Sequence, residues 1–147
     1  MKPHRLSAEA DLSPSPTQLV ELANRARATA GCGALRWDAE LAAAAQAHGR
    51  DLVWAESFSH TGSDGSNVLH RVRRHSTRWR LVGENLASGM SLAEDAIVAW
   101  LNSPAHRDNL LNADFTHVGS GIQALRVVEG FMPGYLFVQV YGRFATT

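Results

Sequence analysis

The first repeating pattern of apolar residues begins after the pair Ser15-Pro16 and ends at Gly31. The apolar positions recur every three or four residues, as on one face of a helix, at Leu19, Leu22, Ala23 and Ala26. Serine can accept a hydrogen bond from a free amide at a helix start, and proline fits the first helical turn. The pattern therefore predicts a helix that starts at Pro16 and stops before Gly31.

A second helical pattern follows Asp38, whose carboxylate can cap a helix. Its apolar face carries Leu41, Ala44, Ala45, His48 and Leu52. We therefore expect His48 to point toward the core. A histidine in such a place is more often a hydrogen-bonded core residue than a metal ligand, so we interpret it as structural.

Another helix, the fourth in chain order, is predicted to begin within the four residues Ser91-Leu92-Ala93-Glu94. They have the form of a capping box, in which serine and glutamate side chains each bond the other residue's amide. The apolar stripe that follows contains Ala93, Ala96, Ile97, Trp100 and Leu101. This capping role explains Glu94, and Pro104 either ends this helix or starts the next one.

Between the second and fourth helices we expect a polar loop, a short third helix and a short strand. Residues 58–66 hold two glycines, three serines and an aspartate, which is typical of a loop, and His60 lies within it. Residues 67–74 are expected to form the short helix. In the strand 83–87, Glu84 interrupts apolar neighbours. It is either exposed on a sheet edge or buried with a cationic or hydrogen-bonding partner.

The last part of the chain predicts two strands joined by residues 130–134. In the first strand, Gly119 and Gly121 alternate with larger side chains, at Val118, Ser120, Ile122 and Ala124. The second strand, residues 135–141, is apolar on both faces, so helices should cover the sheet on both sides. A hairpin connection makes the pairing antiparallel. We therefore predict the α+β class, as a three-layer α/β/α sandwich with a small antiparallel sheet.

Length and composition limit the alternatives. The chain has 147 residues, 45% hydrophobic and 19% charged, so residues 15–147 suit a single domain that follows a flexible arm of residues 1–14. No apolar run is long enough to cross a membrane. The formal net charge is +0, which argues against a nucleic-acid partner. The first residues have no apolar segment typical of a signal peptide, so either the protein is cytosolic or a leader is missing from the sequence.

Two local features qualify this picture. Residues 70–80 are rich in arginine, and we interpret them as a solvated loop and helix end, with a patch for an acidic partner as the alternative. Cys32 is the only cysteine, which excludes an internal disulfide and a multi-cysteine metal site.

Five motifs occur in an order that resembles a known family. They are, in chain order, Phe58-Ser-His60-Thr, Gly83-Glu84-Asn85-Leu86-Ala, residues 99–112 around Ser103-Pro104-Ala-His106, Phe115-Thr-His-Val-Gly119 and Phe137-Val-Gln139-Val-Tyr-Gly142. Over residues 17–144 the chain is similar to the bacterial branch of the CAP superfamily, which comprises cysteine-rich secretory proteins, antigen 5 and pathogenesis-related 1 proteins. This unit is also called the SCP domain. The fold of that family is an α/β/α sandwich, in agreement with the apolar pattern.

The resemblance implies a cleft lined by two histidines and two glutamates, in which the histidines can bind a divalent metal such as zinc. His60 and His106 match the two histidines, and Glu84 matches the glutamate of the Gly-Glu-Asn motif. The second glutamate usually lies three residues after the tryptophan of the preceding helix, and here Ser103 stands at that position. We therefore expect His60, Glu84, Ser103 and His106 to bind a ligand. We expect His60 and His106 to hold zinc only weakly.

Three interpretations of these residues are open. The resemblance favours an exported binding module, monomeric and located outside the cell or in the cell envelope, that takes a small molecule, a lipid or a cell-wall fragment. The alternative is a metal-assisted hydrolase of peptides or glycans, with Glu84 as the general base. The third interpretation is a purely structural polar network. A serine hydrolase built on Ser103 and His106 is disfavoured, because Ser103 is placed to cap a helix and a Gly-x-Ser-x-Gly motif is absent.

Overall fold

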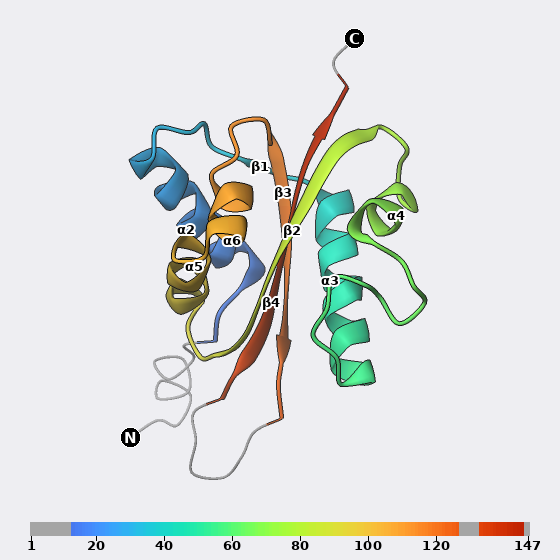
Figure 1. The fold of residues 1–147 in the computed structure, drawn as a ribbon. Coiled ribbons are helices and arrows are strands. Elements are labelled where there is room, and N and C mark those ends of the chain that lie inside the picture. The colour runs from blue at the N-terminus through green and yellow to red at the C-terminus, as the bar shows by residue number, and fades with distance from the viewer. Residues whose placement is uncertain (1–12, 127–132, 146–147) are drawn as a thin grey trace, which may run out of the picture.

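The computed structural model describes residues 13–126 and 133–145, and Figure 1 labels its elements. In chain order they are helix α2 (Pro16–Thr29), strand β1 (Arg36–Trp37), helix α3 (Ala39–Ala55), helix α4 (Val68–Arg73), strand β2 (Trp79–Met90), helix α5 (Ala93–Leu101), helix α6 (Pro104–Leu110), strand β3 (His117–Ala124) and strand β4 (Tyr135–Phe144). The predicted flexible arm, residues 1–14, lies almost wholly outside the described residues. In the part of the chain that is described, no helix is long and apolar enough to cross a membrane.

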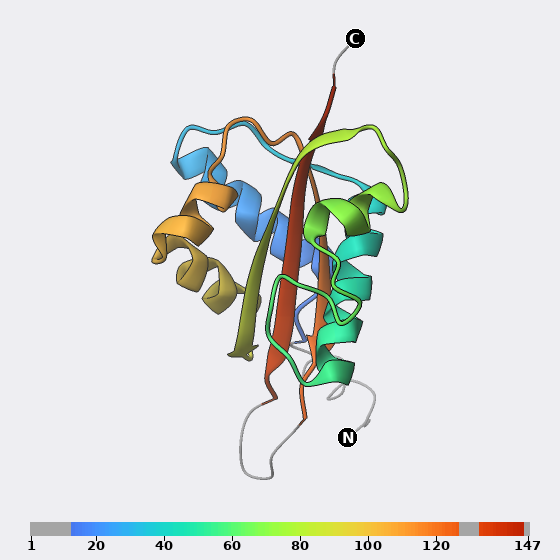
Figure 2. The same cartoon turned by 45° about the vertical axis from the view of Figure 1, so that its right-hand side comes forward.

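The strands form one sheet that separates two groups of helices. The strand order is β1-β3-β4-β2, which makes β2 an edge strand. Helices α3 and α4 cover one face, and α2, α5 and α6 cover the other, as Figures 1 and 2 show from two directions. The predicted three-layer α+β sandwich is confirmed.

The sheet is mixed, whereas the sequence predicts antiparallel pairs alone. Strands β2, β4 and β3 pair antiparallel, in agreement with the expected hairpin. Strand β1 pairs parallel with β3, with Arg36 opposite His117. A strand of 2 residues leaves no alternating pattern in the sequence, which is why the parallel pair is not predictable from periodicity.

The first two helices begin where the sequence predicts. The Ser15 hydroxyl accepts from the amide of Gln18 at 3.1 Å, and the Gln18 side chain accepts from the amide of Ser15 at 3.4 Å, which forms a capping box. One Asp38 carboxylate oxygen accepts from the amides of Glu40 and Leu41 at 2.8 and 3.0 Å. Both starts depend on local side chains, so the sequence contains the whole signal.

The capping box predicted for α5 is wrong. Leu92 occupies the N-cap position, and no side chain makes a cap hydrogen bond there. The Ser91 hydroxyl donates instead to the carbonyl oxygen of Pro133. The Glu94 carboxylate accepts from the Gln18 amide group at 3.4 Å, so it links α5 to α2. Distant partners have therefore displaced the local motif.

Two glycines of β3 allow α3 to lie directly on the sheet. A Cβ atom at Gly119 would lie 2.0 Å from the backbone nitrogen of Ala42, and one at Gly121 would lie 2.8 Å from the Cα atom of Gln46. Any larger residue would push α3 away from the sheet. This close contact sets the position of His48, in the next turn of α3.

Strand β2 is longer than the predicted segment 83–87. Helices α5 and α6, on the other face of the sheet from α3, are hydrogen-bonded to its backbone. The indole nitrogen of Trp100 in α5 donates to the carbonyl oxygen of Leu86 at 2.9 Å. The Asn109 side chain of α6 donates to the carbonyl oxygen of Glu84 at 3.1 Å. These bonds fix α5 and α6 against the edge strand that carries Glu84.

Candidate functional site

Glu84 is buried and paired, which settles the alternatives that the sequence leaves open. Its side chain is 1% exposed. One guanidinium nitrogen of Arg71 donates to both carboxylate oxygens, at 2.9 and 3.2 Å. A ring nitrogen of His60, Nδ1, lies 2.9 Å from the Oε1 atom. Both carboxylate oxygens therefore have a partner within the protein.

Arg71 is the site residue that the sequence analysis missed. Asn67 caps α4 by accepting from the amide of His70 at 2.9 Å, and this start turns Arg71 and Val72 toward the core. A second guanidinium nitrogen of Arg71 donates to the carbonyl oxygen of Ser66 at 2.9 Å. The signal was available in part, because a buried glutamate requires a cation and residues 70–80 supply several.

The arginine-rich stretch 70–80 is therefore not a simple solvated segment. Arg71 is buried, and two exposed arginines of the stretch are paired within the domain. Arg74 lies 2.7 Å from Asp64, and Arg78 lies 2.9 Å from Asp38. The interpretation as a solvated loop and helix end is wrong for Arg71, and these pairs reduce the positive charge that the stretch offers to a partner.

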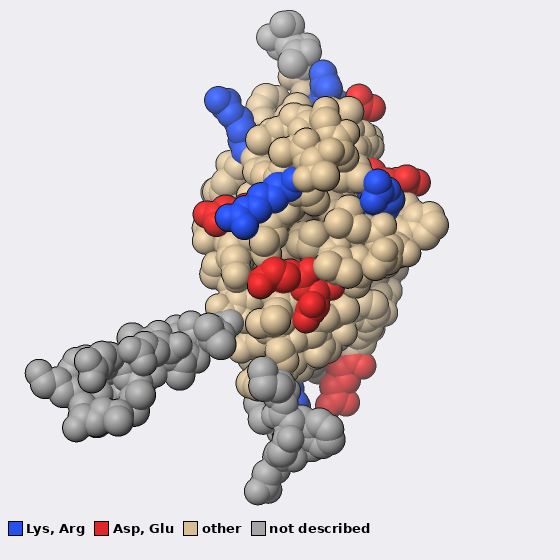
Figure 3. All heavy atoms as spheres, turned by 90° about the vertical axis from the view of Figure 1, so that its left-hand side faces the viewer, with Lys and Arg blue, Asp and Glu red and all other residues tan. Residues whose placement is uncertain are grey.

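The opposite face of the molecule has no broad basic area in the part that the described atoms cover. Figure 3 views the layer of α2, α5 and α6. Acidic side chains gather near the middle of this face, and separate basic side chains lie above them. The visible part of this face therefore offers no continuous row of positive charges to a polyanion.

His60 lies at the surface, and its bond to Glu84 fixes the orientation of its ring. Its side chain is 57% exposed, although its partner Glu84 is buried. The hydrogen bond to the Glu84 carboxylate raises the pKa of His60, because it favours the imidazolium form. The bond uses Nδ1, so the second ring nitrogen, Nε2, is left for a ligand.

His48 is a hydrogen-bonded core residue, as predicted, and it also contacts the site. Its Nε2 atom lies 2.8 Å from the carbonyl oxygen of Ser59 and 3.8 Å from a Glu84 carboxylate oxygen. Burial lowers the pKa of His48, which favours the neutral ring. The bond to Ser59 attaches the loop that carries His60 to helix α3.

The residue after Glu84 positions His106 from the other face of the sheet. The Asn85 side chain donates to the carbonyl oxygen of His106 at 2.9 Å and accepts from Asn109 at 3.1 Å. A Cβ atom at Gly83 would lie 2.8 Å from the ring of Phe115. In the Gly-Glu-Asn motif, glycine therefore provides space, glutamate positions His60, and asparagine positions the helix of His106.

Ser103 occupies the N-cap position of α6, as predicted, but its hydroxyl makes no cap hydrogen bond. The prediction that this hydroxyl caps the helix, by accepting from the amide of His106 or a neighbour, is therefore wrong. The backbone carbonyl of Ser103 accepts from the amide of Arg107 at 2.7 Å instead. Within the described chain, no hydrogen bond joins the Ser103 hydroxyl to the ring of His106.

The structure thus brings the side chains of His60 and Glu84 together. It ties the main chain of His106 to Asn85, the residue after Glu84. Among residues 13–126 and 133–145, no group of three or more His, Cys, Asp or Glu side chains is arranged to hold a metal ion. Glu84 does not suit direct ligation of an ion, because Arg71 and His60 already bond its oxygens. A carboxylate bonded to the far nitrogen of a histidine is a common way to orient a metal ligand.

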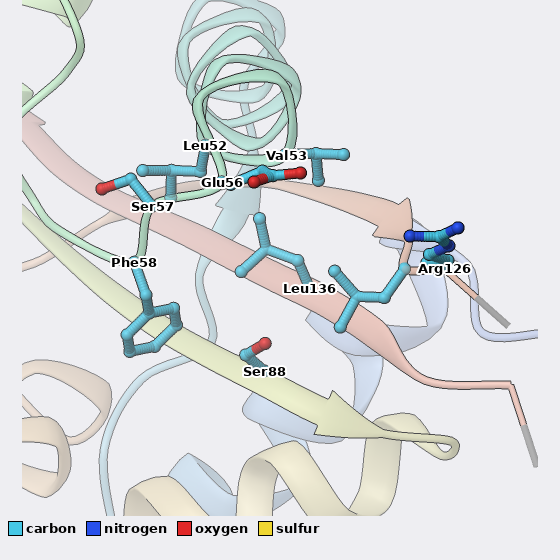
Figure 4. A pocket seen from close by; sticks show the side chains of 9 residues that line it. Leu52, Val53, Glu56, Ser57, Phe58, Ser88, Arg126 and Leu136 are labelled. Carbon is cyan, nitrogen blue, oxygen red and sulfur yellow. The ribbon is translucent and has the colours of Figure 1, made fainter. Parts of the chain in front are cut away.

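A mainly apolar pocket of about 430 Å³ opens between the end of α3 and the sheet. Phe58, two residues before His60, lies at one end beside Ser88 of β2, and Arg126 lies at the other end (Figure 4). The remaining side chains that line it are Leu52, Val53, Glu56, Ser57, Leu125 and Leu136. The sequence analysis did not predict this pocket, because its walls come from four separate segments.

The model of the cysteine-rich secretory protein family, CAP, matches residues 20–141 of the chain. The chain belongs to the CAP family. This CAP domain is similar to the uncharacterised protein YkwD of Bacillus subtilis (strain 168), with 32% identity over 115 residues, which are 78% of this chain and 45% of YkwD. It is also similar to the uncharacterised membrane protein YlbC of the same organism, with 31% identity over 118 residues, which are 80% of this chain and 34% of YlbC.

Two solved structures share the fold of this CAP domain. An extracellular SCP-domain protein from Bacillus anthracis has a TM-score of 0.75 and 31% identity, and the match covers 87% of this chain and 40% of that one. An outer surface protein from Borrelia burgdorferi has a TM-score of 0.75 and 25% identity, with 86% and 90% covered. The chain spans less than half the length of the Bacillus relatives, so it corresponds to one part of those proteins.

Proposed function

We propose that this CAP domain is a ligand-binding module that works outside the cell or in the cell envelope. Its site is formed by His60, Glu84, Ser103 and His106. The observation that supports binding over catalysis is the state of Glu84, whose carboxylate is buried and bonded to Arg71 and His60. A general base has to reach the proton that it removes, and this carboxylate has little free surface with which to do so.

The remaining polar groups suit recognition of a ligand. His60 offers its exposed Nε2 atom, and Ser103 offers a hydroxyl without a cap bond. Phe58, which lines the apolar pocket, is on the same loop as His60. A molecule with an apolar part and a polar group therefore fits this side of the domain. Molecules of lipid or cell-wall origin have this character.

The comparisons support the proposed location. One structural relative is described as an extracellular protein and another as an outer surface protein. Both are similar to this chain at 25% identity or more. A module exposed to the cell envelope would meet lipids and cell-wall fragments there.

A metal-assisted hydrolase is the second candidate, favoured by the bond between Glu84 and His60. This bond orients His60 as the outer carboxylate orients a metal-bound histidine. His60 and His106 would hold the ion, and an ion bound there would supply a polarised water or carbonyl group. Ser103 stands where the family usually has a second carboxylate, so the site has one acid or base fewer for such a reaction.

Binding and turnover can be measured side by side with one variant. Wild-type protein and Glu84→Gln are titrated calorimetrically with a lysophospholipid and with a muropeptide, and the same mixtures are analysed for products by mass spectrometry with and without Zn²⁺. We expect wild-type protein to bind one of the two probes, Glu84→Gln to bind it within a few fold, and no product to form. If wild-type protein forms product, and the rate of its formation falls about 100-fold or more in Glu84→Gln, the hydrolase would be established instead.

A further inference from the structure

The apolar pocket at the end of α3 has two charged side chains among its walls. Its volume is about 430 Å³, and its apolar surface includes Leu52, Leu125 and Leu136. Glu56 and Arg126 line it too, and both residues are exposed. Within the described chain, neither of them forms an ion pair. The pocket therefore offers one negative and one positive charge beside an apolar surface.

Glu56 has a backbone conformation that favours glycine. Its φ angle is 51°, and among the described residues it is the only one other than glycine with a positive φ. It caps the end of α3, where its amide donates to the carbonyl oxygen of Val53 at 3.3 Å. Helices commonly end on a glycine in this conformation, because a Cβ atom there costs free energy. The end of the helix therefore does not require a glutamate, and its carboxylate is free for another role.

The charged and apolar parts of the pocket follow one another along its length. In Figure 4, Arg126 lies at one end and Phe58 at the other, and Glu56 extends from the end of α3 between them. Leu136 of β4 forms the floor of the middle part. A ligand that places its charged groups near Glu56 and Arg126 would therefore place its apolar part along Leu136 toward Phe58.

The two charges select the chemistry of the occupant. A simple anion is attracted by Arg126 but repelled by Glu56, and the reverse holds for a simple cation. A ligand that carries both an anionic group and an ammonium group is attracted by both side chains. The C-terminal end of α3 adds a partial negative charge on the side of Glu56, which further favours an ammonium group there.

The apolar walls add a second requirement. Phe58 is 57% exposed and Val53 is 38% exposed, so both offer apolar surface that a ligand can cover. Covering such surface removes it from water, which favours a ligand with a hydrocarbon part. A small zwitterion without a hydrocarbon part would leave this surface in water and would bind more weakly.

We propose that the apolar pocket binds a zwitterionic amphiphile, which is a molecule with an anionic group, an ammonium group and a hydrocarbon part. The anionic group contacts Arg126, the ammonium group contacts Glu56, and the hydrocarbon part covers Leu136 and Phe58. The inference rests on the proposed binding function and narrows the class of ligand for it. It also gives roles to two charged residues that the family resemblance does not mark.

The test titrates ¹⁵N-labelled wild-type protein with hexylphosphocholine, a zwitterion with a short hydrocarbon chain. Nuclear magnetic resonance follows the backbone amides of Phe58 and Ser88, which lie at one end of the pocket. We expect both signals to shift and to saturate in the millimolar range. Each of the matched probes lacks one feature: hexanesulfonate has no ammonium group, hexyltrimethylammonium has no anionic group, and phosphocholine has no chain. Each should bind at least several fold more weakly.

Two substitutions remove the charged contacts one at a time. Glu56→Gly removes the carboxylate and introduces a residue that adopts a φ of 51° without strain. It should weaken hexylphosphocholine binding several fold, while the thermal midpoint stays at or above that of wild type. Arg126→Gln should weaken binding to a similar extent. The matched controls Glu21→Gln and Arg25→Gln change exposed positions of α2, on the other face of the sheet, and should bind as wild type does.

The proposal is overturned if hexylphosphocholine gives no saturating shifts, or if a probe that lacks one feature binds as tightly. It is also overturned if Glu56→Gly and Arg126→Gln bind as wild type does. In each of these cases the proposed function still stands if the muropeptide binds wild-type protein and fails to bind His60→Ala. Both proposals fail if no probe of either experiment binds.

Discussion

At the scale of single residues, the ion pair between Arg71 and Glu84 decides how the site behaves. Both partners are buried, so removal of one leaves an uncompensated charge inside the protein. We expect Arg71→Met to lower the free energy of unfolding by about 3–5 kcal/mol, as measured by urea denaturation.

The control for Arg71→Met is Arg74→Met, which removes an exposed arginine three residues further along the chain. Its partner Asp64 is at the surface, so the urea midpoint should hardly move. Adding Glu84→Gln to Arg71→Met should restore part of the lost stability, because the uncompensated charge is then gone. If Arg71→Met and Arg74→Met behave alike, the ion pair is not a determinant of stability.

The bond between His60 and Glu84 predicts a pH-dependent contribution to stability. Glu84 raises the pKa of His60 in the folded state above its unfolded value, near 6.5. The contribution is therefore complete below the unfolded pKa and is lost as the pH rises through the folded pKa. His60→Ala should destabilise the protein more at pH 5 than at pH 9.

The size of this effect is limited by solvent, because the His60 side chain is 57% exposed. We expect a difference below about 1 kcal/mol between the two pH values, from urea denaturation of wild-type and variant protein. His48 is present in both proteins, so its own titration cancels in the comparison. An effect of His60→Ala that is the same at both pH values would contradict the assignment.

At the scale of elements, the contact between β2 and α6 depends on the absence of a side chain at Gly83. A methyl group there would lie 2.8 Å from a ring carbon of Phe115 and 3.0 Å from the Asn109 side chain. We expect Gly83→Ala to destabilise the domain by about 1–3 kcal/mol, because Phe115 is packed in the core. Gly33→Ala is the matched control, since a Cβ atom there has open space, and its thermal midpoint should stay close to that of wild type.

We expect the loop of His60 and helix α6 together to determine any affinity for zinc. Two imidazoles without a third protein ligand form an incomplete zinc site. We expect calorimetric titration to give a dissociation constant weaker than about micromolar, and the binding to vanish in both His60→Ala and His106→Ala. The exposed His75 lies outside the site, so His75→Ala should bind as wild type does. Binding that survives in either site variant would place the ion elsewhere.

The success of sequence analysis for each element depended on where its partners lie in the chain. The starts at Ser15 and Asp38 were predictable, because the capped amides are two or three residues away. The start of α5 was not, because Ser91 bonds Pro133 instead of the helix beside it. Local side chains carry the signal for a cap only when no distant group competes for them.

At the scale of the whole molecule, the site is assembled from both faces of the sheet at one edge strand. The family resemblance supplied His60, Glu84, Ser103 and His106 as a set. It supplied neither Arg71, which reaches Glu84 from α4, nor the bond of Asn85 that fixes α6. These contacts depend on how α4 and α6 pack against β2, and periodicity contains no information on that packing.

The bonds that fix α5 and α6 to β2 have a further consequence for solubility. An edge strand of 12 residues with free carbonyl groups is a template on which a strand of another copy can pair. Side chains of Trp100 and Asn109 already bond two of these carbonyls, and Arg73 bonds that of Trp79. Trp100→Phe keeps an aromatic ring but removes the donor. It should therefore increase fibril formation, measured by thioflavin fluorescence, while it lowers the thermal midpoint only slightly. The residues that hold the site together would thus also keep the protein from aggregating.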